Sequence, residues 1–155
     1  MLSKGGSRLS EQTTCSAIIS FAEKLEDNSS KFYEELAEKY EENKEIFLAF
    51  AKEGRKNKVL VTRTYQETIT DALEACFIQI DLSNYLAETI LKEDMSYLDA
   101  LKMAIELEEK ASKFYFSAAE QSKSLLATIP RAFRKVAEKR NNRKPKLKSL
   151  VESLM

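Results

Sequence analysis

The stretch AEKLEDNSSKFYEELAE, residues Ala22–Glu38, decides the fold, because it returns later in the chain as AIELEEKASKFYFSAAE, residues Ala104–Glu120. The two copies align without gaps, and nine of their seventeen positions are identical. Each copy is followed by a related second stretch, FLAFAKEGRKN at Phe47–Asn57 and FRKVAEKRNNR at Phe133–Arg143. A solenoid needs three or more stacked repeats. Two long copies therefore indicate a duplicated pair of helices.

The scarcity of glycine and proline makes the chain helical. Its 155 residues include three glycines and two prolines, and between Arg8 and Ile129 only Gly54 is of either kind. Turns between β-strands depend on these residues, so an all-β fold is excluded. With 43% hydrophobic residues the chain can build a core without disulfides. The sequence predicts a disordered terminus at residues 1–10 and one all-α domain at residues 11–155.

Apolar residues at three- and four-residue steps predict where the helices lie. The first helix is expected at about Glu11–Glu41, and the second follows a break at Asn43. The region Gln66–Leu91 is also helical in pattern, so we expect it to form a long helical crossover. Two helical hairpins joined in this way make a four-helix bundle with one long connection.

Capping residues and prolines predict where the later helices begin and end. Ser96 followed by Asp99 forms a capping-box pattern that opens the third helix. Thr128 is expected to cap the last helix, with Pro130 in its first turn. Pro145 should kink or end that helix, because proline lacks the backbone donor and clashes with the preceding turn.

Each copy of the repeat carries a glutamate seven residues before the tyrosine of a Phe-Tyr pair. The pairs are Glu26 with Tyr33 and Glu108 with Tyr115. Seven residues make two helical turns, so each acid shares a face with its tyrosine beside the apolar stripe. Both carboxylates are therefore expected to point into the bundle, although solvated positions on the surface are the alternative. A buried carboxylate is costly unless a metal or a basic side chain compensates its charge.

With these residues the chain resembles the rubrerythrin branch of the ferritin-like superfamily. The family signature is A-x-x-x-E-x-x-x-x-x-F-Y on the first and third helices and F-x-x-x-A-x-x-E-x-x-H on the second and fourth. The resemblance covers about Ala17–Leu150 and implies a ferritin-like four-helix bundle. In that family, one Glu from the first and third helices and a Glu-x-x-His pair from the others hold a di-iron or related centre. Many members act as peroxidases, ferroxidases or oxidases.

Carried over by position, the resemblance leaves two of six metal ligands, Glu26 and Glu108. The four remaining ligand positions hold other residues: Gly54, Asn57, Arg140 and Arg143. The chain contains no histidine, and a guanidinium stays protonated and offers no lone pair to a metal. We therefore expect no bound metal and no cofactor.

Arginine offers a different way to compensate the two acids. We predict that Arg140, together with Arg143, pairs with Glu26 and Glu108 and replaces the positive charge of two metal ions. Arginine suits this position because its planar fork can donate two hydrogen bonds to a carboxylate. The residues Tyr33 and Tyr115 are expected to line the site as packing residues with hydrogen-bonded hydroxyls.

The two cysteines, Cys15 and Cys76, share no CxxC spacing. We interpret them as buried, reduced core residues, which favours a cytoplasmic protein. The longest stretch without a charged residue, Gln12–Ala22, is too short to span a bilayer. No membrane association is expected.

A basic run occupies Arg131–Lys148, with nine bases and one acid. Such a run could bind nucleic acid without sequence preference. Its aromatic content is the single residue Phe133, and the net charge of the chain is zero. A solvated helix face, or one that pairs with the acidic first hairpin or with a second copy, is the favoured interpretation.

Three functions follow from these patterns. The favoured one is a ferritin-like protein that has lost its di-iron centre and serves as a non-catalytic binding or structural module, self-associating as a dimer. The alternative is an iron-binding oxidoreductase or peroxidase with an atypical site around Glu26, Glu108 and Asn57. A nucleic-acid-associated protein using the last helix is the second alternative. No catalytic residue is predicted.

Overall fold

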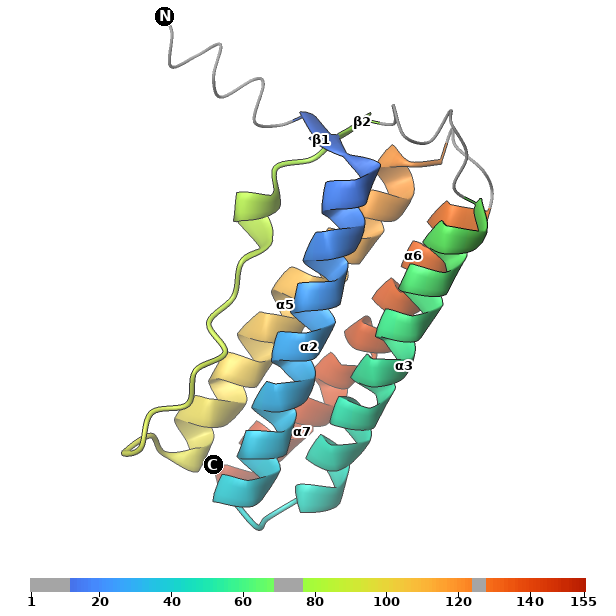
Figure 1. Cartoon of the computed structure of the whole chain (residues 1–155). Helices are drawn as coiled ribbons and strands as arrows, with labels where there is room; N and C mark the ends of the chain where they lie inside the picture. Colours follow the sequence, from blue (N-terminus) through green and yellow to red (C-terminus); the bar gives the residue numbers. More distant parts are fainter. Residues whose placement is uncertain (1–11, 69–76, 124–127) are drawn as a thin grey trace, which may run out of the picture.

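Apolar side chains at helical spacing form the core of a bundle. The computed structural model describes residues 12–68, 77–123 and 128–155. The long elements lie alongside one another (Figure 1): α2 (Cys15–Lys39), α3 (Lys44–Thr68), α5 (Tyr97–Gln121), α6 (Thr128–Asn141) and α7 (Arg143–Leu154). The prediction of an all-α protein is confirmed, and the predicted terminus at residues 1–10 lies outside the described residues.

The ends of the helices follow the capping residues. The side chain of Thr14 accepts a hydrogen bond from the backbone N–H of Ala17 and so caps α2. The turn between α2 and α3 contains Asn43 at φ 63°, a left-handed conformation that asparagine tolerates better than most residues. Ser96 caps α5 by accepting from the N–H of Asp99 at 3.1 Å. The break at Asn43 and the cap at Ser96 were both predicted.

The last helical segment is broken where Pro145 requires it. Helix α6 ends at Asn141, four residues before the proline, and α7 begins at Arg143. A proline ring clashes with the carbonyl one turn back and leaves that carbonyl without its partner. The predicted break is confirmed. It places Pro145 in the first turn of α7, a position that proline tolerates well.

The described part of the crossover is extended, and the prediction of a helical crossover is wrong for residues 77–91. Helix α3 continues through Thr68, but it is followed among the described residues by strand β2 (Phe77–Gln79), the short 3₁₀ helix η1 (Leu82–Tyr85) and irregular chain. This segment runs along the outside of the bundle from β2, beside β1, to the start of α5 (Figure 1). A 25-residue helix is about 37 Å long. The sixteen residues 81–96, which lead from the small sheet to α5, would cover only about 24 Å as a helix. They cover up to about 53 Å when extended, so an extended chain spans the bundle.

A small antiparallel sheet joins the crossover to the start of α2. Strand β1 (Gln12–Thr14) pairs with β2, with Thr13 opposite Ile78. Ile78 and Ile80 are buried while Phe77 and Gln79 are exposed, the two-residue alternation of a half-buried strand. The predicted start of the first helix at about Glu11 is therefore too early.

Cys15 lines the core as predicted, but it is disulfide-bonded and not a free thiol. Disulfides persist in oxidising compartments, so the expected cytoplasmic location loses the support of this residue. Cys76 lies outside the described residues. None of the helices in the described ranges combines the length and apolarity needed to span a membrane.

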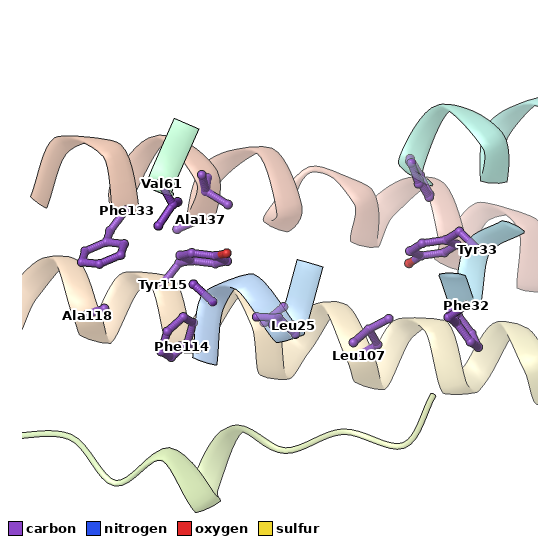
Figure 2. Close-up of a cluster of buried hydrophobic side chains, with 14 of the residues drawn as sticks. Leu25, Phe32, Tyr33, Val61, Leu107, Phe114, Tyr115, Ala118, Phe133 and Ala137 are labelled. Atoms are coloured by element: carbon purple, nitrogen blue, oxygen red, sulfur yellow. The ribbon is translucent and has the colours of Figure 1, made fainter. Parts of the chain in front are cut away.

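The two helical hairpins pack against each other around one shared core. Helix α2 packs against α3, and α5 packs against α6. The hairpins meet through contacts of α3 with α6 and of α2 with α5. Figure 2 shows Tyr33 and Tyr115 among the buried apolar side chains, with their hydroxyl oxygens directed toward each other.

Candidate functional site

Four charged side chains lie in the middle of the bundle, where apolar residues would be expected. Glu26 of α2, Glu108 of α5, Arg140 of α6 and Arg143 of α7 are each at most 1% exposed. Charged residues are almost never buried this fully unless they are paired. We call these four residues, with Tyr33 and Tyr115, the buried cluster.

Arg140 links the two glutamates of the repeat. Its Nη1 donates to Oε1 of Glu26 at 2.7 Å, and its Nη2 donates to Oε2 of Glu108 at 3.0 Å. The same Nη2 also donates to Oγ of Ser29 at 2.8 Å. The predicted pairing of Arg140 with both acids is confirmed by these contacts, and the surface position considered for the acids is wrong.

Arg143 binds the cluster from the other side of the helix break. Its Nη1 donates to Oε2 of Glu108 at 3.2 Å. Its Nη2 donates to the carbonyl of Phe50 at 3.1 Å and to Oε1 of Glu53 at 2.9 Å. The guanidinium also lies over the ring of Phe50, 5.0 Å from its centroid. One arginine thus ties α7 to both α3 and α5.

The two tyrosines close the ends of the cluster symmetrically across the repeat. The hydroxyl of Tyr33 donates to Oε2 of Glu108 at 2.6 Å, and that of Tyr115 donates to Oε2 of Glu26 at 2.7 Å. Each tyrosine therefore binds the glutamate of the other copy. Burial, followed by the charge of the glutamate, raises the pKa of Tyr33 and of Tyr115 well above the ordinary value. Both act as neutral hydrogen-bond donors, as predicted for site-lining residues.

The charges of the cluster balance inside the protein. Two carboxylates face two guanidinium groups, and the half-exposed Glu53 adds a further acid at the edge. Burial lowers the pKa of Arg140, but the carboxylates of Glu108 and Glu26 raise it by more, so the net pKa is above the ordinary value. Arg140 therefore stays a cation in the folded protein.

Gly54 packs directly against the cluster. A Cβ at this position would lie 2.4 Å from Oγ of Ser30 and 3.3 Å from Oε1 of Glu26. The hydroxyl of Ser30 is held there because it donates to the carbonyl of Ala51 at 2.9 Å. A larger residue, such as the glutamate of the family pattern, requires Ser30 to move.

Several buried polar atoms of the described residues have no hydrogen-bond partner within the protein. Both side-chain polar atoms of Asn57 are in this state, together with Oε1 of Glu108 and Nε of Arg140. Asn57 is fully buried and stands where the family pattern has a histidine. Unpaired buried polar groups are costly, so this part of the cluster is incompletely satisfied by protein atoms.

The residues present do not fit a di-iron centre. Oε1 of Glu26 and Oε2 of Glu108 accept hydrogen bonds from arginine instead of being free to bind a metal. Arg140 and Arg143 supply no lone pair. Among the described ranges, no three His, Cys, Asp or Glu side chains are grouped so that they could hold a metal ion.

Two contributors to the cluster were missed by sequence reasoning. Ser29 follows Glu26 by one helical turn, and this spacing was the available signal for a second inward polar group. Its counterpart in the second copy is Ala111, so the repeat itself did not mark Ser29. Glu53 gave no signal, because its role depends on where α7 lies relative to α3.

Comparison of the chain with protein-family models, with curated proteins and with solved structures finds no match. The geometry of the buried cluster is therefore the basis on which a function can be assigned.

Proposed function

We propose that the chain is a ferritin-like, rubrerythrin-related protein in which an arginine–glutamate cluster has replaced the di-iron centre. It then acts as a non-catalytic binding or structural module, and dimer formation is part of the proposal. The observation that carries it is the fully buried guanidinium of Arg140, which binds Glu26 and Glu108 at once. These are the two ligand positions that the chain shares with the family pattern.

The charge balance supports the loss of metal chemistry. In a di-iron protein the cations are the metal ions, and the carboxylates are free to coordinate them. Here the guanidinium groups of Arg140 and Arg143 occupy the charge-compensating role. A metal entering this site would have to displace arginines that are themselves buried, leaving their charges unpaired.

The alternative is an iron-binding oxidoreductase with an atypical site around Glu26, Glu108 and Asn57. The unpaired side chain of Asn57 and the free Oε1 of Glu108 are the observations in its favour. Two oxygen donors and one amide with two arginines nearby form a poor site for a redox metal, because these metals favour imidazole and several carboxylates. We therefore rank the substituted cluster first.

Metal analysis tests the proposal. The purified protein is assayed for metal before and after anaerobic loading with iron(II) followed by air. We expect no stoichiometric metal and no absorption from an oxo-bridged iron pair. Stoichiometric iron, manganese or zinc would contradict the proposal and favour the oxidoreductase.

A variant that rebuilds the family pattern serves as the matched positive control. It carries five substitutions: Ser30→Ala, Gly54→Glu, Asn57→His, Arg140→Glu and Arg143→His. The change at Ser30 makes room for the glutamate at position 54. Iron binding by this variant, with none by the original chain, would support both the ferritin-like origin and the role of the arginines.

A further inference from the structure

The basic run at Arg131–Lys148 divides into an inner and an outer set. Arg140 and Arg143 are buried in the cluster, and Lys144 bonds to Glu109 at 3.0 Å. The other six bases remain at the surface, and all are exposed except the half-buried Lys139. They are Arg131, Arg134, Lys135, Lys139, Lys146 and Lys148. The fold therefore keeps most of the run available to a partner.

Helix α3 brings further bases to the same side of the bundle. Arg143 bonds to Glu53, which fixes the level of α3 against the antiparallel α6–α7 segment. Because the two segments are antiparallel, a step forward on α3 corresponds to a step back on α6–α7. Lys56 lies three residues after Glu53, and Arg140 lies three residues before Arg143 and next to Lys139. Glu53 and Lys56 are one helical turn apart and so share a side of α3. The exposed Lys56 thus lies on the side of α3 that faces α6, level with Lys139.

The orientation of α6 places its lysines beside Lys56. The pKa of Glu120 of α5 is lowered mainly by Lys123 and also by the charge of Arg134, which agrees with a position of Arg134 on the α5 side of α6. Lys135 is one residue further along and is rotated by about 100°. Lys135 and Lys139 are one turn apart and therefore lie on the side of α6 that faces α3.

Four residues of α3 and α6 make up what we call the basic face: Lys56, Arg131, Lys135 and Lys139. Three exposed acids, Glu45, Glu67 and Glu138, lie on these helices, and Glu53 is already bonded to Arg143. A net positive field follows, although the chain as a whole has no net charge. Such a face attracts a polyanion.

The spacing of the basic face decides which polyanion it fits. Arg131, Lys135 and Lys139 recur every four residues, which is about 6 Å along the helix. The bases are spread along two straight helices and do not converge, so a single phosphate group would not be enclosed. A chain of regularly spaced phosphates can contact them in succession.

The side chains around these bases narrow the choice further. None of the aromatic residues of α3 and α6 is exposed, so no ring is available on which a single-stranded base could stack. Leu48 and Val59 are the exposed large apolar side chains of these two helices, and two separate aliphatic side chains do not make the continuous apolar face that insertion into a bilayer requires. We infer that the basic face binds the phosphate backbone of double-stranded nucleic acid without reading its sequence.

Fluorescence anisotropy of a labelled duplex DNA of about 20 base pairs tests this inference. Contacts to three or four phosphates predict a slope of log K against log salt of roughly −2.7 to −3.6. Affinity should then fall about 40- to 150-fold between about 50 and 200 mM salt, alike for unrelated sequences. Absence of binding at 50 mM salt would overturn the inference.

Two triple variants with equal net charge locate the contact. Lys56→Glu, Lys135→Glu and Lys139→Glu reverse the basic face, and we expect at least about tenfold weaker binding. Lys24→Glu, Lys31→Glu and Lys102→Glu reverse three exposed lysines on α2 and α5. The affinity of this variant for DNA should stay closer to that of the original chain. Equal losses in the two variants would show a general charge effect and overturn the assignment to this face.

Competition separates nucleic acid from other polyanions. Unlabelled duplex should displace the labelled DNA, while polyglutamate of equal charge and vesicles with anionic lipids should displace it only weakly. Displacement by polyglutamate or by vesicles as efficient as by DNA would overturn duplex binding in favour of an acidic protein or a membrane surface. The basic face and the buried cluster share no residue, so the DNA measurement and the iron measurement can fail separately.

Discussion

Arg140 and Glu26 are separated by 114 residues in the chain, yet Nη1 of Arg140 donates to Oε1 of Glu26 at 2.7 Å and neither side chain is exposed. The contact joins α6 to α2, which belong to different hairpins. Because Nη2 of the same arginine reaches Glu108 of α5, one side chain connects both copies of the repeat. The energetic consequences of this position can be measured.

Removal of Arg140 should strongly destabilise the protein. Arg140→Ala leaves Glu26 and Glu108 buried with less compensating charge, which costs about 3–5 kcal/mol of unfolding free energy. Urea denaturation measures the loss. Arg134→Ala on the same helix removes an exposed arginine and should change stability by less than about 0.5 kcal/mol. A comparably small effect for Arg140→Ala would contradict the buried pairing.

The two tyrosines should differ in their contribution to stability. Oε2 of Glu26 accepts a hydrogen bond from Tyr115, whereas Oε2 of Glu108 accepts hydrogen bonds from Tyr33, Arg140 and Arg143. Tyr115→Phe should therefore cost about 1.5–3 kcal/mol, the range for a hydrogen bond to a charged group. Tyr33→Phe should cost less, because its carboxylate keeps two donors. Thermal or urea unfolding of the two variants decides the order, and equal or reversed costs would show that the donors are not shared in this way.

Stability should decline at high pH because of the same tyrosines. The pKa of Tyr33 and of Tyr115 is raised in the folded protein, whereas an unfolded tyrosine has a pKa of about 10. The folded state then holds protons that the unfolded state releases, so this stabilisation is complete below about pH 10 and is lost as pH rises further.

Urea unfolding between about pH 9 and 11 measures this decline. Each tyrosine contributes up to about 1.4 kcal/mol per pH unit to the slope. A variant with both tyrosines replaced by phenylalanine keeps the lysines that also titrate in this range, and should show a shallower slope. Identical slopes would mean that the two hydroxyls ionise in the folded protein as they do in the unfolded chain.

The effect of replacing Gly54 on stability should depend on the side chain of Ser30. Replacing a helical glycine by alanine usually adds about 1 kcal/mol of stability. Here the new Cβ would meet Oγ of Ser30 at 2.4 Å and force this hydroxyl away from the carbonyl of Ala51. Gly54→Ala should therefore add no stability by itself.

A double-mutant cycle isolates the steric term. In a Ser30→Ala background, where the hydroxyl is absent, Gly54→Ala should recover the gain, with an interaction energy of about 1 kcal/mol. Additive effects of the two substitutions would show that Ser30 moves aside freely.

The repeat allowed much of the buried cluster to be predicted. Glu26, Glu108, Tyr33 and Tyr115 follow from helical periodicity, because two turns of separation put each pair on one face. Arg140 followed from its place relative to Phe133 and Ala137, which are both buried one or two turns earlier on α6. The crossing of partners, in which each tyrosine binds the glutamate of the other copy, could not be predicted. Periodicity describes one helix and contains no information about the helix opposite.

Errors in the sequence predictions fall where a local pattern competes with a long-range constraint. Residues 77–91 have helical periodicity, but Phe77–Gln79 pair with β1 at one end of the bundle, and the residues left before α5 are long enough to span the bundle only as an extended chain. Cys15 was interpreted as a free thiol from composition, and its disulfide depends on a contact that the sequence does not reveal.

The sequence by itself determined that this protein is helical, that its helices come in two related hairpins, and that acids and bases would meet in its interior. These properties depend on spacing along one helix and on the rarity of glycine and proline. Only the tertiary structure decided that Arg143 would bind Glu53 and the carbonyl of Phe50, and that Asn57 would be buried with unpaired polar atoms. Each of these depends on how far one helix is shifted and rotated against another. That placement is set by the packing of the whole core, to which every helix contributes.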